Sequence, residues 1–78
     1  MNRTEVLEQV QDIFRNILDD EDIVLTDEST AEDVEEWDSL THIQLIKAIE
    51  KAYSIRFTSR EILSWNNVGE MLDCILKK

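Results

Sequence analysis

A chain of 78 residues with no proline, one glycine and 42% hydrophobic residues has the length of one domain, residues 1–78, and a composition that favours helices over a multi-stranded sheet. Its formal net charge of −10 excludes nucleic acid as an expected partner and favours basic protein surfaces instead, because phosphate backbones select surfaces rich in Lys and Arg. No apolar run approaches the roughly 20 residues of a membrane-spanning helix, and no signal-peptide pattern is present, so we expect a cytoplasmic monomer that does not insert into membranes.

The first predicted element is an amphipathic helix that begins after Asn2. Asn2 and Glu5 have the spacing of a capping box, in which side chains satisfy the free N–H groups of a first helical turn. The apolar residues recur at helical spacing and form one core-facing stripe: Val6, Leu7, Val10, Ile13, Phe14, Ile17 and Leu18.

Residues 19–38 are expected to form a long loop. They include 11 of the 18 acidic residues and no basic residue, and repulsion at this density disfavours a regular helix. One helical turn is expected near residues 31–34. A calcium-binding EF-hand is excluded, because a loop starting at Asp20 would place Leu25 at the sixth position, where glycine is required. Loops of this length in small domains are usually functional. The expected apolar anchors are Ile23, Val24, Leu25 and Val34.

A second helix is predicted to begin at Ser39, with Asp38 as its N-cap. Ser39 would then project into solvent from the first position of a rigid element. An anionic group attached there would face the positive end of the helix dipole, close to free backbone N–H groups. The apolar residues of this helix are Leu40, Ile43, Leu45, Ile46, Ile49 and Tyr53.

Two further capping patterns predict two further helices. Thr58 and Glu61 open a brief third helix that runs through Leu63, and Asn67 and Glu70 open a fourth. The fold class is therefore all-α: a four-helix bundle of three longer helices and one short helix, with a long acidic loop between the first two. The fourth helix is expected to turn the following residues to the core: Val68, Met71, Leu72, Ile75 and Leu76.

The lone cysteine and the two tryptophans are expected to pack. Cys74 falls on the apolar side of the last helix and is interpreted as a small core residue, and with no partner for a disulfide it suits a reducing compartment. Trp37 and Trp65 are expected to pack over the loop and the third helix, although either is also a candidate contact for a partner.

The run Glu-Trp-Asp-Ser-Leu at residues 36–40 resembles the attachment motif of acyl carrier proteins. The amphipathic first helix, the acidic loop, Ile-Arg-Phe at 55–57 and Asn-Val-Gly-Glu at 67–70 follow in the same order, so the resemblance covers nearly the whole chain. It implies a carrier that is not an enzyme. A phosphopantetheinyl transferase would move 4'-phosphopantetheine from coenzyme A to Ser39, and the thiol of that arm would hold an acyl group as a thioester.

The resemblance also implies roles for neighbouring residues. Asp38 would cap the helix and contribute to transferase recognition, Leu40 would complete the motif, and no metal ligand is expected. A solvated His42 is expected, with pH sensing or contact with the arm as the alternative. The candidate contacts for the transferase and for acyl-loading and acyl-processing enzymes are Trp37, Thr41, His42, Gln44 and Lys47. The candidates to line a space for the acyl chain are Leu45, Ile46, Ile49, Ile62, Leu63 and Met71.

The second helix departs from fatty-acid carriers, in which it is usually strongly acidic. This departure argues against docking to the usual fatty-acid synthesis enzymes and favours a dedicated carrier of a specialised pathway, whether polyketide-like, lipid-modifying or aminoacyl. A fatty-acid-like pathway stays open. An aminoacyl or peptidyl carrier is an alternative, although many of these have Gly-Gly-His-Ser at the attachment site. The other alternative is an unmodified acidic helical interaction module, in which Ser39 merely starts a helix. The exposed positions that carry this departure are Thr41, His42, Gln44, Lys47, Glu50 and Lys51.

Overall fold

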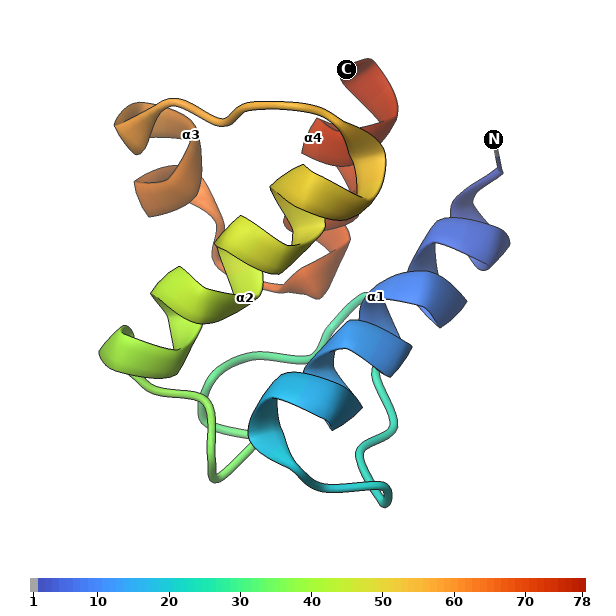
Figure 1. The fold of residues 1–78 in the computed structure, drawn as a ribbon, viewed down its shortest axis with the longest axis vertical. Helices are drawn as coiled ribbons and strands as arrows, with labels where there is room; N and C mark the ends of the chain where they lie inside the picture. The colour runs from blue at the N-terminus through green and yellow to red at the C-terminus, as the bar shows by residue number, and fades with distance from the viewer. Residues whose placement is uncertain (1) are drawn as a thin grey trace.

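The computed structural model describes residues 2–78 and contains four helices in that range (Figure 1). The all-α prediction of three longer helices and one short helix is confirmed, and residues 2–78 include no strand. No helix in this range combines the length and the apolar character needed to cross a bilayer. Both the start of the first helix and the end of the last lie far from the start of the second (Figure 1). The helices are α1 (Arg3–Leu18), α2 (Ser39–Tyr53), α3 (Ser59–Ser64) and α4 (Val68–Lys77).

Each helix begins where a local capping pattern predicts it, because a side-chain oxygen accepts a backbone N–H of the first turn. At the other ends, α1 and α2 stop at Asp19 and Ser54, whose φ angles of 52° and 54° are left-handed and break the helical path. The N-cap residues are Asn2, Asp38, Thr58 and Asn67.

The core lies between α1, α2 and α4 and is closed by apolar side chains of the segment between α1 and α2. From that segment, Ile23, Leu25, Val34 and Trp37 are buried, whereas Val24 is 70% exposed and is not the anchor that was expected. The fully buried side chains of the helices are Val6, Val10, Phe14, Leu45, Ile49, Val68, Met71, Leu72 and Ile75.

The apolar residues of α2 do not all lie on one face of the helix. Leu40 is 70% exposed and Ile43 is 54% exposed, whereas Ile49 is fully buried. Residues three apart on a helix lie about 60° short of a full turn, so three such steps carry the side chains from one face to the opposite one. On α4, Leu76 was predicted to face the core, but it is 37% exposed and lies outside it.

The acidic segment 19–38 contains hydrogen-bonded turns and is fastened to α1. The expected helical turn near residues 31–34 is present only as turns, one of them closed by the Asp33 N–H on the Thr30 carbonyl at 3.0 Å. Arg15 donates from Nε to the Ile23 carbonyl at 2.8 Å, and Gln11 Oε1 accepts the Leu25 N–H at 2.9 Å. Side chains of α1 therefore satisfy the backbone of the segment on either side of Val24.

The same segment is also fastened to the first turn of α4. The Val68 N–H donates to the Ser29 carbonyl at 2.9 Å, and the Gly69 N–H donates to the Asp27 carbonyl at 2.8 Å. A Cβ at Gly69 would lie 2.9 Å from that Asp27 oxygen, so the close approach of two backbones requires glycine here. Loop carbonyls therefore satisfy N–H groups that the start of a helix leaves free.

Arg3 joins three parts of the chain through its guanidinium group. Nε donates to the Asp27 carboxylate at 3.2 Å, Nη2 donates to the Gly69 carbonyl at 3.0 Å, and Nη1 pairs with Asp73. These contacts raise the pKa of Arg3, with the hydrogen bond to Asp73 as the largest cause. The first turn of α1 is thereby tied to both the acidic segment and α4.

Candidate functional site

Ser39 occupies the first position of α2 with its side chain exposed. Asp38 Oδ1 accepts the N–H groups of Leu40 at 3.0 Å and Thr41 at 2.9 Å, while Thr41 Oγ1 accepts the Asp38 N–H at 2.8 Å. This is a complete capping box with Thr in the place usually taken by Glu or Gln. The sequence predicted Asp38 as the N-cap of this helix. It did not predict the hydrogen bond between the Asp38 N–H and Thr41 Oγ1, although Thr41 follows Asp38 by three residues.

The surroundings of Ser39 combine a helix N-terminus, which favours an attached anion, with the ionised carboxylate of Asp38, which opposes one. The positive end of the α2 dipole lies at this position. Hydrogen bonds, chiefly from the Thr41 N–H, lower the pKa of the Asp38 carboxyl below its usual value, so the cap stays ionised. The Asp38 carboxylate accepts the N–H groups of Leu40 and Thr41, which were expected to be free. The N–H of Ser39 has no protein acceptor within residues 2–78 and is therefore available to an attached group. The exposed hydroxyl leaves room for a phosphodiester.

His42 lies one turn beyond Ser39 and is not the solvated side chain that was expected. Trp37 Nε1 donates to His42 Nδ1 at 3.0 Å, and the two rings stack with centroids 5.8 Å apart. Trp65 meets the imidazole edge-on at 6.3 Å. Burial between these rings lowers the pKa of His42. Sequence spacing did not reveal this arrangement, because Trp65 approaches from beyond α3.

The five expected partner contacts divide into buried and accessible residues. Trp37 is only 8% exposed and packs edge-on against Phe14 with centroids 4.9 Å apart, which supports its packing interpretation and leaves little of it for a partner. Thr41 is occupied by the capping box, and His42 is half-buried. Gln44 and Lys47 are exposed on α2, on the same helix as Ser39.

The residues expected to line an acyl space are divided between the core and the surface. Leu45, Ile49 and Met71 are fully buried in the core, while Leu63 is 85% exposed and lies away from them. An open groove of about 250 Å³ lies instead beside α2 and α3, and it includes only Ile46 and Ile62 of the expected set. Its complete lining is Ile43, Ile46, Lys47, Glu50, Phe57 and Ile62.

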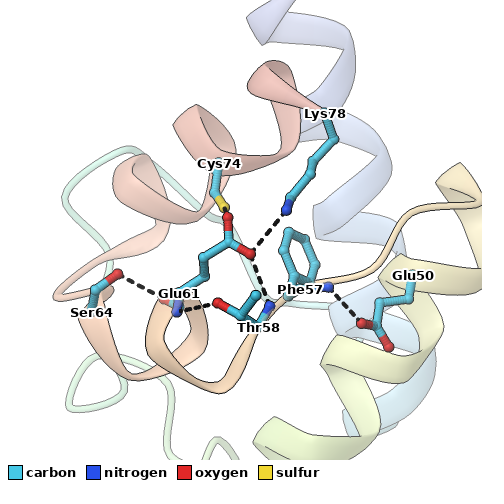
Figure 2. Close-up of polar contacts among 7 residues, drawn as sticks. All are labelled: Glu50, Phe57, Thr58, Glu61, Ser64, Cys74 and Lys78. Atoms are coloured by element: carbon cyan, nitrogen blue, oxygen red, sulfur yellow. Dashed lines mark hydrogen bonds and ion pairs between the residues drawn. The ribbon is translucent and has the colours of Figure 1, made fainter.

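Two carboxylates hold the segments that border this groove (Figure 2). Glu50 Oε2 accepts the Phe57 N–H at 2.9 Å, which fixes the connection between α2 and α3. Glu61 Oε1 accepts the Thr58 N–H at 2.8 Å and pairs with Lys78 Nζ at 2.9 Å. The Thr58 hydrogen bond, followed by the contact with Lys78, lowers the pKa of Glu61 to about 2. The short helix α3 is thereby anchored at its first turn.

Cys74 is half-buried and is not the core residue that was predicted. Its Sγ donates to Glu61 Oε2 at 3.4 Å, so the thiol completes the set of contacts around that carboxylate. Burial raises the pKa of the thiol, and the neighbouring Glu61 raises it further. Cys74 therefore remains protonated near neutral pH, which does not suit a nucleophile.

Comparisons with known proteins agree with this geometry. Residues 8–75 match the family described as phosphopantetheine attachment site. An acyl carrier protein of Thermosynechococcus vestitus (strain NIES-2133 / IAM M-273 / BP-1) is 34% identical over 79 aligned residues, which cover 100% of this chain and 96% of that protein. The solution NMR structure of a holo acyl carrier protein from Geobacter metallireducens matches with a TM-score of 0.87 and 43% identity, over 92% of this chain and 83% of that one. Because these matches extend over nearly the whole sequence, the chain belongs to the acyl carrier protein family and is a carrier with a phosphopantetheine prosthetic group.

Proposed function

We propose that Ser39 is the residue that carries phosphopantetheine. The observation that carries this proposal is an exposed hydroxyl at the first position of α2, held there by the Asp38–Thr41 capping box. Two other serines are engaged elsewhere: Ser29 is buried, and Ser64 Oγ donates to the Glu61 carbonyl at 2.7 Å.

Presentation is the contribution of this chain to the chemistry. When attached, phosphopantetheine supplies a flexible arm with a terminal thiol that binds acyl groups as thioesters. The start of α2 holds the attachment oxygen on a rigid element, and the helix dipole favours the phosphodiester by roughly 0.3–1 kcal/mol. Asp38 stays ionised beside it and offers a carboxylate to the transferase or its metal ion. The chain itself performs no catalysis.

The proposed partners are a phosphopantetheinyl transferase and enzymes that load and process the acyl group. Glu50 is the one acidic residue of α2, which also contains Lys47 and Lys51. This charge pattern favours a polyketide-like or other specialised pathway over the usual fatty-acid enzymes, since complementary charge determines which enzymes approach a carrier quickly. A fatty-acid-like pathway is the alternative. Cys74, the one cysteine in the sequence, suits a reducing cytoplasm.

Intact-mass measurement tests the attachment site directly. The full chain is incubated with coenzyme A and a broad-specificity transferase, and we expect its mass to increase by one phosphopantetheine unit. Ser39→Ala should abolish that increase. Ser59→Ala is the matched control, because Ser59 is also exposed at the first position of a capped helix, α3. An increase that persists in Ser39→Ala, or no increase with a transferase that modifies a reference carrier, would reject the proposal.

A further inference from the structure

The charges of this chain are unevenly distributed along it. Eleven of the 18 acidic residues lie between residues 19 and 38, and none of the eight basic residues does. On α2 the balance reverses, with Lys47 and Lys51 against Glu50, and Arg56 follows in the connection to α3. A basic surface therefore interrupts a protein whose net charge is strongly negative.

The single carboxylate of α2 offsets only part of the charge of that surface, because it is one negative charge against three positive ones. Glu50 Oε2 accepts the Phe57 N–H at 2.9 Å and points toward the connection between α2 and α3 (Figure 2). Among the described residues 2–78, the ion pairs are those of Arg3 with Asp27 and Asp73 and of Lys78 with Glu61. Lys47, Lys51 and Arg56 take part in none of them.

These three cations gather around one hollow of the surface. Together with Glu50, Ser54 and Ile55 they line a wide depression of about 610 Å³. Lys47 and Glu50 also line the apolar groove beside α2 and α3, so the depression and the groove adjoin. Ile43 also lines the apolar groove and is 54% exposed. We call this combined surface of Ile43, Lys47, Lys51 and Arg56 the basic groove.

We propose that the basic groove docks a partner enzyme whose surface presents carboxylates around an apolar side chain. Unpaired cations beside an exposed apolar side chain are complementary to that combination, and like charges on a partner would be repelled. Lys47 follows Ser39 by eight residues, about 12 Å along the helix, so an enzyme seated there stands close to the attachment position. The net charge of −10 disfavours an anionic lipid surface as the occupant.

The inference goes beyond the proposed function and does not depend on Ser39, because docking on the basic groove requires no prosthetic group. Two synthetic peptides serve as probes. Both have a central leucine, which is flanked on each side by glutamates in one peptide and by lysines in the other. Each is titrated into the ¹⁵N-labelled full chain. The glutamate peptide should shift the amide signals of Ile43, Lys47 and Ile55, whereas the lysine peptide should shift signals of residues 19–38.

Two double charge reversals with the same change in net charge distinguish docking from general attraction. Lys47→Glu/Lys51→Glu should weaken the glutamate peptide by about tenfold or more. Arg60→Glu/Lys77→Glu, which alters exposed cations outside the groove, should leave its affinity within about twofold. The neutral variant Lys47→Gln/Lys51→Gln should show an intermediate loss, and circular dichroism confirms that each variant is folded.

Three results would overturn the inference: equal losses in the two reversed variants, glutamate-peptide shifts that avoid the groove, or binding of the groove to phosphatidylglycerol vesicles in preference to the peptide. Ser39→Ala should bind the glutamate peptide as the wild type does. The peptide titration therefore still tests docking if Ser39 is not the attachment residue. The mass measurement likewise still tests attachment if the basic groove binds no peptide.

Discussion

Trp37 donates its indole N–H to Nδ1 of His42 across 3.0 Å, and this contact sets the protonation state of the histidine. An acceptor nitrogen must keep its lone pair, so the neutral ring has its proton on Nε2. A second proton on Nδ1 would place two donors against each other. The imidazole thus links the acidic segment to α2 only while it is uncharged.

We therefore expect His42 to titrate below its ordinary pKa of 6.5, because burial disfavours the charged ring. With the folded pKa below the unfolded one, the unfolded chain binds more protons between the two values. The contribution of His42 to stability is complete above pH 6.5 and decreases as the pH falls toward its folded pKa. An NMR titration of the imidazole measures this pKa directly, and a value at or above 6.5 would contradict the argument. His42→Gln, which cannot titrate, should show a flatter stability profile in this window.

Glu61 predicts a second pH dependence, at lower pH. Its folded pKa of about 2 lies below the ordinary value of 4.5, so its contribution is complete above pH 4.5 and is lost as the pH falls toward 2. Glu61→Gln should lower the Tm at neutral pH, and the difference from the wild type should shrink in acid. Glu21→Gln is the control, since Glu21 is exposed and its side chain makes no hydrogen bond within residues 2–78. If Glu61→Gln lowered the Tm by the same amount at every pH, the ionised carboxylate of Glu61 would not be the source of this stability.

Gly69→Ala should reverse the usual sign of a glycine-to-alanine change in a helix. Alanine normally stabilises a helix interior by roughly 0.5–1 kcal/mol. Here the added Cβ would meet the Asp27 carbonyl oxygen at 2.9 Å, so the acidic segment must shift, and we expect a net loss of about 1–3 kcal/mol. Urea unfolding measures the change, and amide exchange at Val68 should accelerate. A more stable variant would show that the backbone contact is loose.

Asp38 allows its roles as cap and as charge to be separated. Asp38→Ala should lower the Tm by about 4–8 °C, because the N–H groups of Leu40 and Thr41 lose their acceptor. Asp38→Asn retains an acceptor oxygen and should recover most of that loss. If the carboxylate also contacts the transferase, modification of Ser39 in Asp38→Asn should be slow although the helix is stable. Modification at the wild-type rate would restrict Asp38 to capping.

The parts of this fold that could be predicted from the sequence are those determined over three or four residues. Asp38, Thr58 and Asn67 each accept an N–H within the following turn, so the start of each helix follows from local spacing. The exposure of Ser39 follows from the same rule. The apolar spacing of α2 was a poorer guide, because regular three-residue steps rotate around a helix and placed Ile43 outside the core.

The remaining features depend on residues brought together from distant parts of the chain. Trp65 lies 23 positions after His42, and Arg3 reaches Gly69 at a separation of 66, so no local pattern indicates either contact. The groove beside α2 likewise exists because Phe57 and Ile62 return to face Ile46. A local motif therefore suffices to predict that Ser39 lies exposed at the start of α2, whereas the surroundings of that motif required the fold.

The distance between the start of α2 and the two chain ends determines how this carrier can be joined to other proteins. The beginning of α1 and the end of α4 lie away from the first turn of α2 (Figure 1). A linker, fusion protein or neighbouring module joined at either end would leave the approach to Ser39 unobstructed. The chain can likewise be immobilised through either terminus while the start of α2 stays accessible to one partner enzyme after another.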